Sequence, residues 1–225
     1  MSANWIPAGW PAPDSIVAGT TLRGGSIASV ELPGEPCWLN QLHGANVVAA
    51  GVYDTPPDAD ASVGHKLGDV CAVRTADCLP LLFCSNDGAE IAAAHAGWRG
   101  LAAGIIEATV AKMAHRPGDI LVWMGPAISQ PAFEVGDEVR DAFVTPDPGA
   151  TGCFVVNERG RWQADLYELA RRQLSALDIA AIYGGGFCTF TDSKRFFSYR
   201  RDADCGRMVS FVAIKSLENT GIAAI

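Results

Sequence analysis

The sequence predicts an α/β protein in which a few helices pack on a mixed β-sheet. Two observations support this fold class: short apolar runs outnumber the segments with helical spacing, and several runs follow one another with no helix between them. A regular alternation of strand and helix is therefore not expected. No low-complexity linker or internal repeat divides the 225 residues, so we expect a single domain over 1–225, with an irregular segment at 1–15.

The predicted strands are short, rich in β-branched residues and bounded by Gly, Pro or Asp. They cover residues 37–42, 46–52, 70–75, 79–83, 90–95, 119–125, 153–157, 180–185 and 207–215. The turn between two of these strands contains Cys78, and a third strand ends at His95 just before a helix. The pattern thus predicts a thiol and an imidazole at the ends of buried strands.

Two helices are clearly indicated, and a third is weaker. Apolar residues at helical spacing predict the first helix over 98–113, and a Pro-Gly pair stops it. The second helix begins after Asp165, where Glu168 three residues later completes a capping-box pattern. The third helix is predicted over 136–144.

Charge and composition limit the partners of the protein. The chain has 25 acidic and 17 basic residues, a net charge of −8, so a general nucleic-acid-binding role is not expected. No apolar run reaches the roughly 18 residues that a membrane span needs, and the first residues lack the pattern of a signal peptide. Seven cysteines without framework spacing indicate reduced thiols. We expect a cytoplasmic protein with a small-molecule substrate; the oligomeric state stays open.

Three residues are candidates for a metal site. His43 and His95 each follow a strand-like run and precede small residues, and Cys78 offers a thiolate. Two imidazoles and one thiolate can hold a catalytic zinc with a fourth position open. A buried cysteine with two hydrogen-bonded histidines is the ordinary alternative, and a Cys78 nucleophile with a histidine base is another. Of the remaining histidines, His115 is expected to be structural and His65 to be solvated.

Several motifs occur in order between Gly19 and Lys215: NQLHGANVV, DADASV, TADCLPLLF, AAAHAGWRGL, GPAIS, FEVGDEV and FFSYRRD followed by GRMVSFV. Together they resemble the YfiH-type family, whose members are variously labelled polyphenol oxidase (laccase), peptidoglycan editing factor and purine nucleoside phosphorylase. The resemblance implies a three-layer α/β/α fold with a mixed sheet. It also implies one zinc ion per chain, bound at the catalytic centre by His43, Cys78 and His95.

The resemblance implies an enzyme that acts on purine nucleosides, by phosphorolysis of adenosine, inosine or methylthioadenosine and by deamination of adenosine. A second reading is an amidase that edits peptidoglycan precursors through the same zinc or through Cys78. The third is a copper-dependent polyphenol oxidoreductase. Laccase chemistry needs several coppers held by many histidines, and the chain has only four, so this reading ranks last.

Three further residues are candidates for substrate binding. Arg23 and the Gly24-Gly25 pair resemble a motif near the start of the family and could bind an anion such as phosphate. Gln41 would project to the same side of a strand as a ligand histidine and could contact a base. Asp77 could orient a metal ligand or transfer a proton. Each has an ordinary alternative: a surface arginine, a hydrogen bond within the fold and a turn residue.

Three other features bear on the pocket or on possible ligands. The segment 26–36 is shorter than in the family, so the rim of the pocket and its substrate preference are expected to differ. Arg99 at a helix start is unfavourable for the helix dipole and hints at a specific partner, although solvation explains it equally well. Asp58 and Asp60 resemble a metal-binding D-x-D, but the preceding prolines favour a turn.

Overall fold

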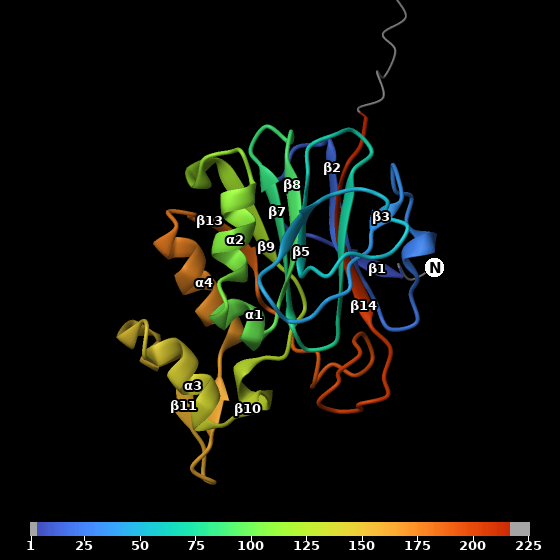
Figure 1. Cartoon of the computed structure of the whole chain (residues 1–225). Coiled ribbons are helices and arrows are strands. Elements are labelled where there is room, and N and C mark those ends of the chain that lie inside the picture. Colours follow the sequence, from blue (N-terminus) through green and yellow to red (C-terminus); the bar gives the residue numbers. More distant parts are fainter. Residues whose placement is uncertain (1–3, 217–225) are drawn as a thin grey trace, which may run out of the picture.

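The computed structural model describes residues 4–216, which form two large β-sheets packed face to face, with helices on the outer face of one of them. In Figure 1 the helices lie on one side, the six-stranded sheet lies in the middle, and the five-stranded sheet lies on the other side. Each sheet is mixed, because parallel and antiparallel pairs occur in both.

The six-stranded sheet carries most of the candidate site. Its spatial order is β13 (Ala181–Gly184), β9 (Ile120–Met124), β7 (Leu79–Ser85), β8 (Ile91–Ala96), β5 (Ala61–Gly64) and β4 (Val47–Ala49). Both faces are covered, and successive side chains of β7 point to opposite sides. Leu81 and Phe83 face the helices, whereas Leu82 and Cys84 face the second sheet, and all four are fully buried. A strand covered on both faces therefore reads as one continuous apolar run.

The five-stranded sheet joins distant parts of the chain. Its order is β1 (Trp5–Pro7), β2 (Ile16–Thr21), β14 (Met208–Ile214), β6 (Val70–Thr75) and β3 (Pro36–Cys37). The core between the sheets contains Val73 and Val212 from this sheet, and Ile91 and Trp123 from the other. Burying an aliphatic or aromatic side chain of this size contributes about 1.5–3 kcal/mol, so this interface is a main source of stability.

The helices cover the other face of the six-stranded sheet. They are α1 (Trp98–Ala102), α2 (Ile105–Lys112) and α4 (Leu166–Ala176), whose apolar sides share one core with that sheet. Helix α3 (Asp137–Val144) lies beside a small antiparallel sheet of β10 (Glu134–Val135), β12 (Trp162–Ala164) and β11 (Phe154–Val156). Among the described residues, no helix has the length and apolar character needed to cross a membrane.

The predicted helices are confirmed, with one change. Asp165 caps α4 by accepting a hydrogen bond from the backbone amide of Glu168. The helix predicted over 98–113 is instead two helices, because Gly104 has a φ of 85°. This left-handed conformation suits glycine and ends α1 before α2 begins.

The α/β class and the mixed sheet are confirmed, but the order of the layers differs from the implied α/β/α. One outer layer is the five-stranded sheet, not a layer of helices. Two of its strands lie outside the predicted ones, and β1 falls within 1–15, which was expected to be irregular. Strand β1 is short and contains a proline, as is tolerated at a sheet edge, and such a run gives little sequence signal.

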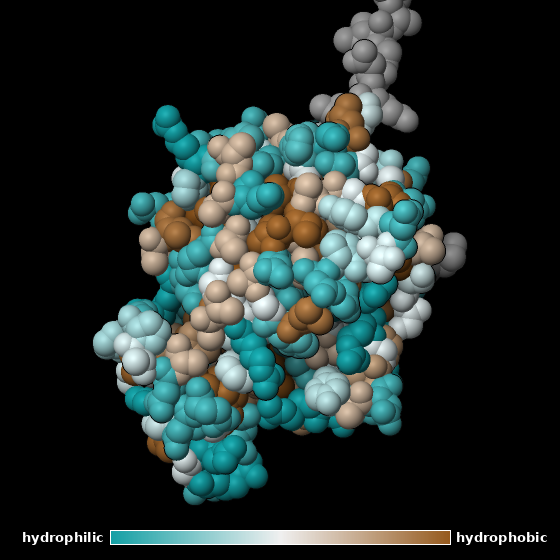
Figure 2. Space-filling model, in the orientation of Figure 1, coloured by the Kyte–Doolittle hydropathy of each residue, from teal (hydrophilic) through white to brown (hydrophobic). Residues whose placement is uncertain are grey.

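Figure 2 shows that the visible face is largely hydrophilic, with hydrophobic residues in small separate patches. This face has no continuous apolar surface of the kind that marks a large docking site. The chemistry-bearing residues gather instead at one end of the six-stranded sheet.

Candidate metal centre

The register of two antiparallel strands brings Cys78 and His95 together. Strand β7 starts at Leu79, which pairs with Ala96, and Pro80 pairs with His95 on β8. Cys78 stands just before β7, so it lies opposite the end of β8, at the Ala96–Gly97 step. Seventeen residues separate the thiol from the imidazole in sequence, and this hairpin is the reason that they meet.

His43 reaches the site from a loop, not from the end of a strand as predicted. Of the predicted strand 37–42, only Cys37 belongs to a strand, β3 (Pro36–Cys37), and His43 itself has a φ of 62°. Left-handed backbone is uncommon outside glycine and costs free energy unless the surroundings support it. The support comes from Asp60, whose carboxylate accepts hydrogen bonds from the backbone amides of Leu42 at 3.1 Å, His43 at 2.9 Å and Gly44 at 2.7 Å.

Asp60 also orients the second histidine. Its Oδ1 atom lies 2.8 Å from Nδ1 of His95, and the two residues are 1% and 3% exposed. A carboxylate bonded to Nδ1 leaves Nε2 free as a metal ligand and fixes the plane of the ring. Burial raises the pKa of Asp60, but the hydrogen bonds from His95 and the loop amides outweigh it and lower that pKa overall. Asp60 therefore holds a charge that positions both histidines.

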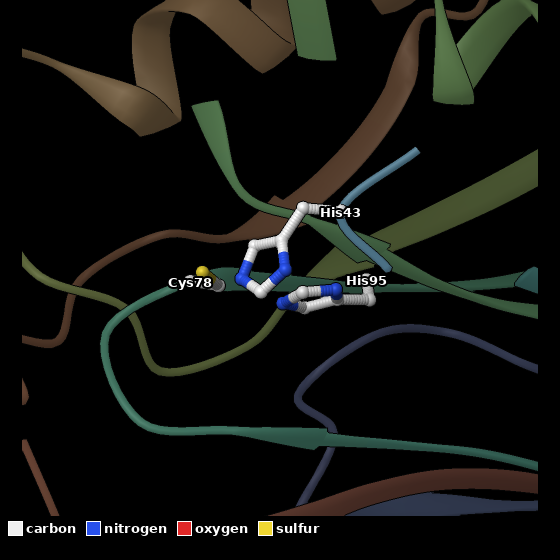
Figure 3. A group of neighbouring side chains, drawn as sticks. All are labelled: His43, Cys78 and His95. Carbon is white, nitrogen blue, oxygen red and sulfur yellow. The ribbon is translucent and has the colours of Figure 1, made fainter. Parts of the chain in front are cut away.

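The three candidate ligands converge in space. Their donor atoms all lie within 4.8 Å of one another, and the rings of His43 and His95 meet edge to face with centroids 4.7 Å apart. Figure 3 shows the three side chains pointing toward a common point, with His43 from the loop, Cys78 from the turn and His95 from β8. Among residues 4–216, this is the one group of three or more histidine, cysteine or acidic side chains with metal-site spacing.

Gly97 leaves the room that a metal would need. A Cβ atom at this position would lie 2.8 Å from Sγ of Cys78 and 3.5 Å from the His43 ring. A side chain there would push the thiol aside. The glycine of the AHAGWRG motif is thus explained by space rather than by an unusual backbone angle, since its φ is −67°.

The thiol and the buried imidazole stabilise each other's charged forms. Burial raises the pKa of Cys78, but hydrogen bonds and charge from His43 and His95 outweigh it and lower the pKa to about 6. Burial lowers the pKa of His95, but Asp60 and Cys78 outweigh it and raise the pKa to about 9. A thiolate is the form of cysteine that binds metals and that acts as a nucleophile.

The donor set fits zinc. Two imidazoles and a thiolate match the ligand types that zinc prefers, and three protein ligands leave one position open, as in catalytic sites. Asp60 supplies the outer carboxylate that commonly orients a metal-bound histidine. Two histidines and a cysteine also suit a single copper, so the donors alone do not choose between the two metals.

The trio opens into a cavity of about 740 Å³. This volume lies in the range of sites for small-molecule ligands. Its wall also includes aromatic side chains, Trp98, Phe133 and Tyr199, and four arginines, Arg74, Arg99, Arg200 and Arg207. A flat apolar ligand with an anionic group would meet suitable partners here.

Of the three predicted substrate-binding residues, Gln41 and Asp77 line the cavity and Arg23 does not. Gln41 lines the cavity, but its side chain is tied to the main chain of Arg74, through Nε2 to the carbonyl at 2.9 Å and through Oε1 to the amide at 2.8 Å. It is therefore held within the fold. Asp77 also lines the cavity and has a φ of 95°, and its carboxylate binds the segment that carries Arg200.

Arg23 is not brought into the cavity. Its backbone amide donates to the carbonyl of Arg195, and its guanidinium donates to the carbonyl of Ser193 at 3.1 Å and stacks on Phe197. These contacts hold it against the segment before β14, so the predicted anion site at Arg23 and the neighbouring glycines does not line the pocket.

Asp60, Arg200 and Arg207 lie at the site but were not predicted as site residues. Asp60 was assigned to a turn, although the apolar ASV that follows it signals entry into a buried strand.

The remaining two histidines, His65 and His115, lie where the sequence predicted. His65 is exposed, and His115 binds Glu90 through Nδ1 at 2.9 Å, remote from the trio.

Comparisons with known proteins place the chain in a family. The family model described as "Multi-copper polyphenol oxidoreductase laccase" matches residues 21–215. A relative from Escherichia coli K12 named "Purine nucleoside phosphorylase YfiH" is 50% identical over 187 residues, which are 83% of this chain and 76% of the relative. A Pseudomonas aeruginosa relative named "Purine nucleoside phosphorylase PA4543" is 44% identical over 92% of this chain and 97% of its own.

Solved structures share the fold. Neisseria meningitidis protein NMB0706 superposes with a TM-score of 0.88 at 40% identity, over 95% of this chain and 100% of that one. YlmD from Geobacillus stearothermophilus gives a TM-score of 0.85 at 26% identity, over 96% of this chain and 98% of its own. The sequence motifs, the family model and these relatives agree: the chain belongs to the YfiH-type family, whose model carries the polyphenol oxidoreductase laccase description.

Proposed function

We propose that this protein is a zinc-dependent purine nucleoside phosphorylase. The observation that carries the proposal is the convergence of His43, Cys78 and His95 in the wall of a cavity large enough for a nucleoside. The printed names of the relatives support it, since those proteins are called purine nucleoside phosphorylases. Adenosine, inosine and methylthioadenosine are the proposed nucleosides, and deamination of adenosine is the proposed second reaction. We further propose a cytoplasmic location.

Phosphorolysis exchanges one bond for another. A phosphate oxygen forms a bond to C1′ of the ribose while the C1′–N9 bond breaks. The purine leaves with the bonding electron pair and takes up the proton that the phosphate loses. The products are the free base and ribose 1-phosphate, or the 1-phosphate of methylthioribose when methylthioadenosine is the substrate. The protein must hold the base, hold the phosphate and favour the charge that develops on the leaving purine.

The residues of the cavity divide these tasks. Trp98, Phe133 and Tyr199 offer rings on which a purine can stack. The arginines of the wall offer charge for the phosphate. His43, Cys78 and His95 would hold the zinc, which when bound supplies a Lewis acid that polarises a substrate group or lowers the pKa of a water. Asp60 keeps the two histidines oriented.

The alternatives predict different products. A multicopper oxidoreductase needs more than one cluster of ligands, and residues 4–216 contain a single such cluster. An amidase would use the same trio with Cys78 as nucleophile, because the low pKa of Cys78 also suits that role. It would release an amino acid from a cell-wall precursor instead of a base from a nucleoside.

One experiment separates these activities. Protein of defined metal content is incubated with purine nucleosides and with muropeptide precursors, with and without phosphate, and the products are identified by mass. Phosphate-dependent formation of free base and ribose 1-phosphate, lost in Cys78→Ala and His95→Ala, is the expected result. Base release that does not need phosphate, or release of an amino acid alone, would overturn the proposal.

A further inference from the structure

The wall of the cavity is positively charged although the protein is acidic overall. Arg74, Arg99, Arg200 and Arg207 line it together with a single carboxylate, that of Asp77. Within residues 4–216, none of these four guanidinium groups lies within ion-pair distance of a carboxylate, whereas several arginines outside the cavity are paired. In a chain of net charge −8, unpaired arginines gathered in one cavity indicate a site for an anion.

Each of the four guanidinium groups stacks on an aromatic ring. The distances from Cζ to the ring centroid are 4.1 Å for Arg74 on Trp38, 4.5 Å for Arg99 on Trp98, 5.5 Å for Arg200 on Phe133 and 5.8 Å for Arg207 on Tyr199. Stacking uses the flat face of the group and leaves N–H donors at its edge. Such arginines are partly ordered in advance and lose less freedom when they bind an oxyanion.

The one carboxylate of the wall does not neutralise them. Asp77 accepts hydrogen bonds from the hydroxyl of Thr189 at 2.6 Å, the hydroxyl of Ser198 at 3.0 Å and the backbone amide of Arg200 at 2.7 Å. Its oxygens are thus occupied by neutral donors. These bonds fix the backbone of Arg200 next to the turn that carries Cys78, while Nη1 of Arg200 donates to the carbonyl of Glu134 at 3.0 Å.

A second, independent feature is an unused hydroxyl. Thr75 lines the same cavity and is 1% exposed, yet its Oγ1 has no hydrogen-bond partner within the part of the chain that the structure describes. A buried hydroxyl without a partner costs free energy and is normally satisfied by a ligand or a water. Thr75 lies three residues before Cys78, and both residues line this cavity.

We infer that Arg99 and Arg200, supported by Arg74 and Arg207, form a phosphoryl-binding site beside the metal centre. Both are tied to the trio: Arg99 follows His95 by four residues, and the backbone amide of Arg200 donates to Asp77, the neighbour of Cys78. The inference rests on the proposed function, because the oxyanion would be the second substrate of phosphorolysis. The same chemistry would also bind the phosphate group of a nucleotide.

The test measures binding directly and without turnover. The metal-loaded protein is titrated with inorganic phosphate, with adenosine 5′-monophosphate and with adenosine, and binding is followed by calorimetry. Arg99→Gln and Arg200→Gln are compared with Arg23→Gln, an arginine that is also exposed and stacked but lies outside the cavity. Each pocket variant should weaken phosphoryl binding by about tenfold or more, since charge-assisted hydrogen bonds are lost. The Arg23→Gln variant should bind phosphoryl groups as tightly as wild type. The affinity for adenosine should be the same in all variants.

The outcomes separate this inference from the proposed function. Arginine-dependent binding of inorganic phosphate supports a free phosphate substrate, and equally dependent but tighter binding of the nucleotide identifies a substrate phosphate as the source. If wild-type protein binds neither anion, or if both variants bind as tightly as wild type, the inference is wrong. If binding depends on the arginines but no base is released, the phosphoryl-binding site is supported and the proposed phosphorylase activity is wrong. If both variants catalyse phosphorolysis with the wild-type phosphate KM, the phosphorylase activity is supported and the phosphoryl-binding site is wrong.

Discussion

Oδ1 of Asp60 lies 2.8 Å from Nδ1 of His95, and the same carboxylate accepts three backbone amides of the loop that carries His43. One buried side chain therefore positions two of the three candidate ligands. Its own position in the DADASV motif, directly before β5, fixes it to the central sheet.

Asp60→Asn should lower metal affinity by about 10–100-fold, the usual effect of removing an outer-sphere carboxylate. The amide still fills the space but loses the charge that holds His95 and the loop amides. Metal competition with a chromogenic chelator measures the change. Asp58→Asn is the matched control, because Asp58 is exposed and bonds the side chain of Asn40. Equal metal affinity in both variants would contradict the role given to Asp60.

Gly97→Ala should block the metal site without unfolding the protein. The new Cβ would stand 2.8 Å from Sγ of Cys78, and overpacking of this kind costs about 1–3 kcal/mol. We expect a large drop in metal content while the circular dichroism spectrum is kept. Gly118→Ala serves as control, since a Cβ there meets nothing within 4 Å. A Gly97→Ala protein with full metal content would show that the thiol does not occupy this place when loaded.

The sequence predicted the grouping of His43, Cys78 and His95 better than it predicted the residues around them. Cys78 directly precedes one buried strand and His95 lies near the end of another, and the motifs around them are specific, so local pattern and resemblance agreed. Asp60 and Arg200 act through long-range hydrogen bonds, which pattern does not reveal. Arg23 was predicted from a motif match, but its tertiary contacts with Ser193 and Phe197 hold it outside the lining of the cavity.

The fold shows a similar division. Continuous apolar strands such as 79–83 were predicted because two-sided burial leaves an apolar signature. The short edge strand β1 and the two-residue strand β10 carry no such signature, since few of their side chains are buried. Which layer would cover the second face of the sheet depends on pairing between residues 16–21 and 208–214, nearly the whole chain apart. No local pattern records that pairing.

Asp77→Asn should loosen the segment around Arg200 while leaving the metal in place. Asparagine tolerates the φ of 95° at this position, but it is neutral and cannot accept all three hydrogen bonds equally well. Hydrogen exchange at the Arg200 amide should become faster, and phosphate binding weaker. Asp202→Asn is the control in the same segment, because it bonds only the nearby amide of Asp204 in its side-chain contacts within the described chain. Unchanged exchange at Arg200 would refute the positioning role.

His115 should stabilise the fold most at acid to neutral pH. Its hydrogen bond to Glu90, with help from Asp87, raises its pKa above the usual 6.5. The folded protein thus holds the proton more tightly than the unfolded chain does. The resulting stability is complete below about pH 6.5 and fades as the pH rises through the higher folded-state pKa.

His115→Gln should therefore lower Tm more at pH 6 than at pH 9, as measured by thermal scans in matched buffers. Asp87 stays ionised over this range because hydrogen bonds, first that from Ser85, lower its pKa to about 2. His65→Gln provides the control, since His65 is exposed and its side chain makes no hydrogen bond within residues 4–216. A Tm loss that does not depend on pH would point to packing instead of charge.

The reactivity of Cys78 toward an alkylating reagent distinguishes a metal ligand from a free nucleophile. Cys188 offers an internal reference: burial raises its pKa, but hydrogen bonds with Ser129 and Thr191 outweigh it and lower the pKa to about 7, and the residue is partly exposed. Iodoacetamide should modify Cys188 in the metal-loaded protein and spare Cys78, because a metal-bound thiolate is a weak nucleophile. A chelator should then make Cys78 reactive, with its pKa near 6, and abolish turnover at the same time. Peptide mapping by mass spectrometry reads both sites in one sample. Alkylation of Cys78 in fully loaded protein, or an acyl group trapped on it during turnover, would favour the amidase with Cys78 as nucleophile over a zinc phosphorylase with Cys78 as ligand.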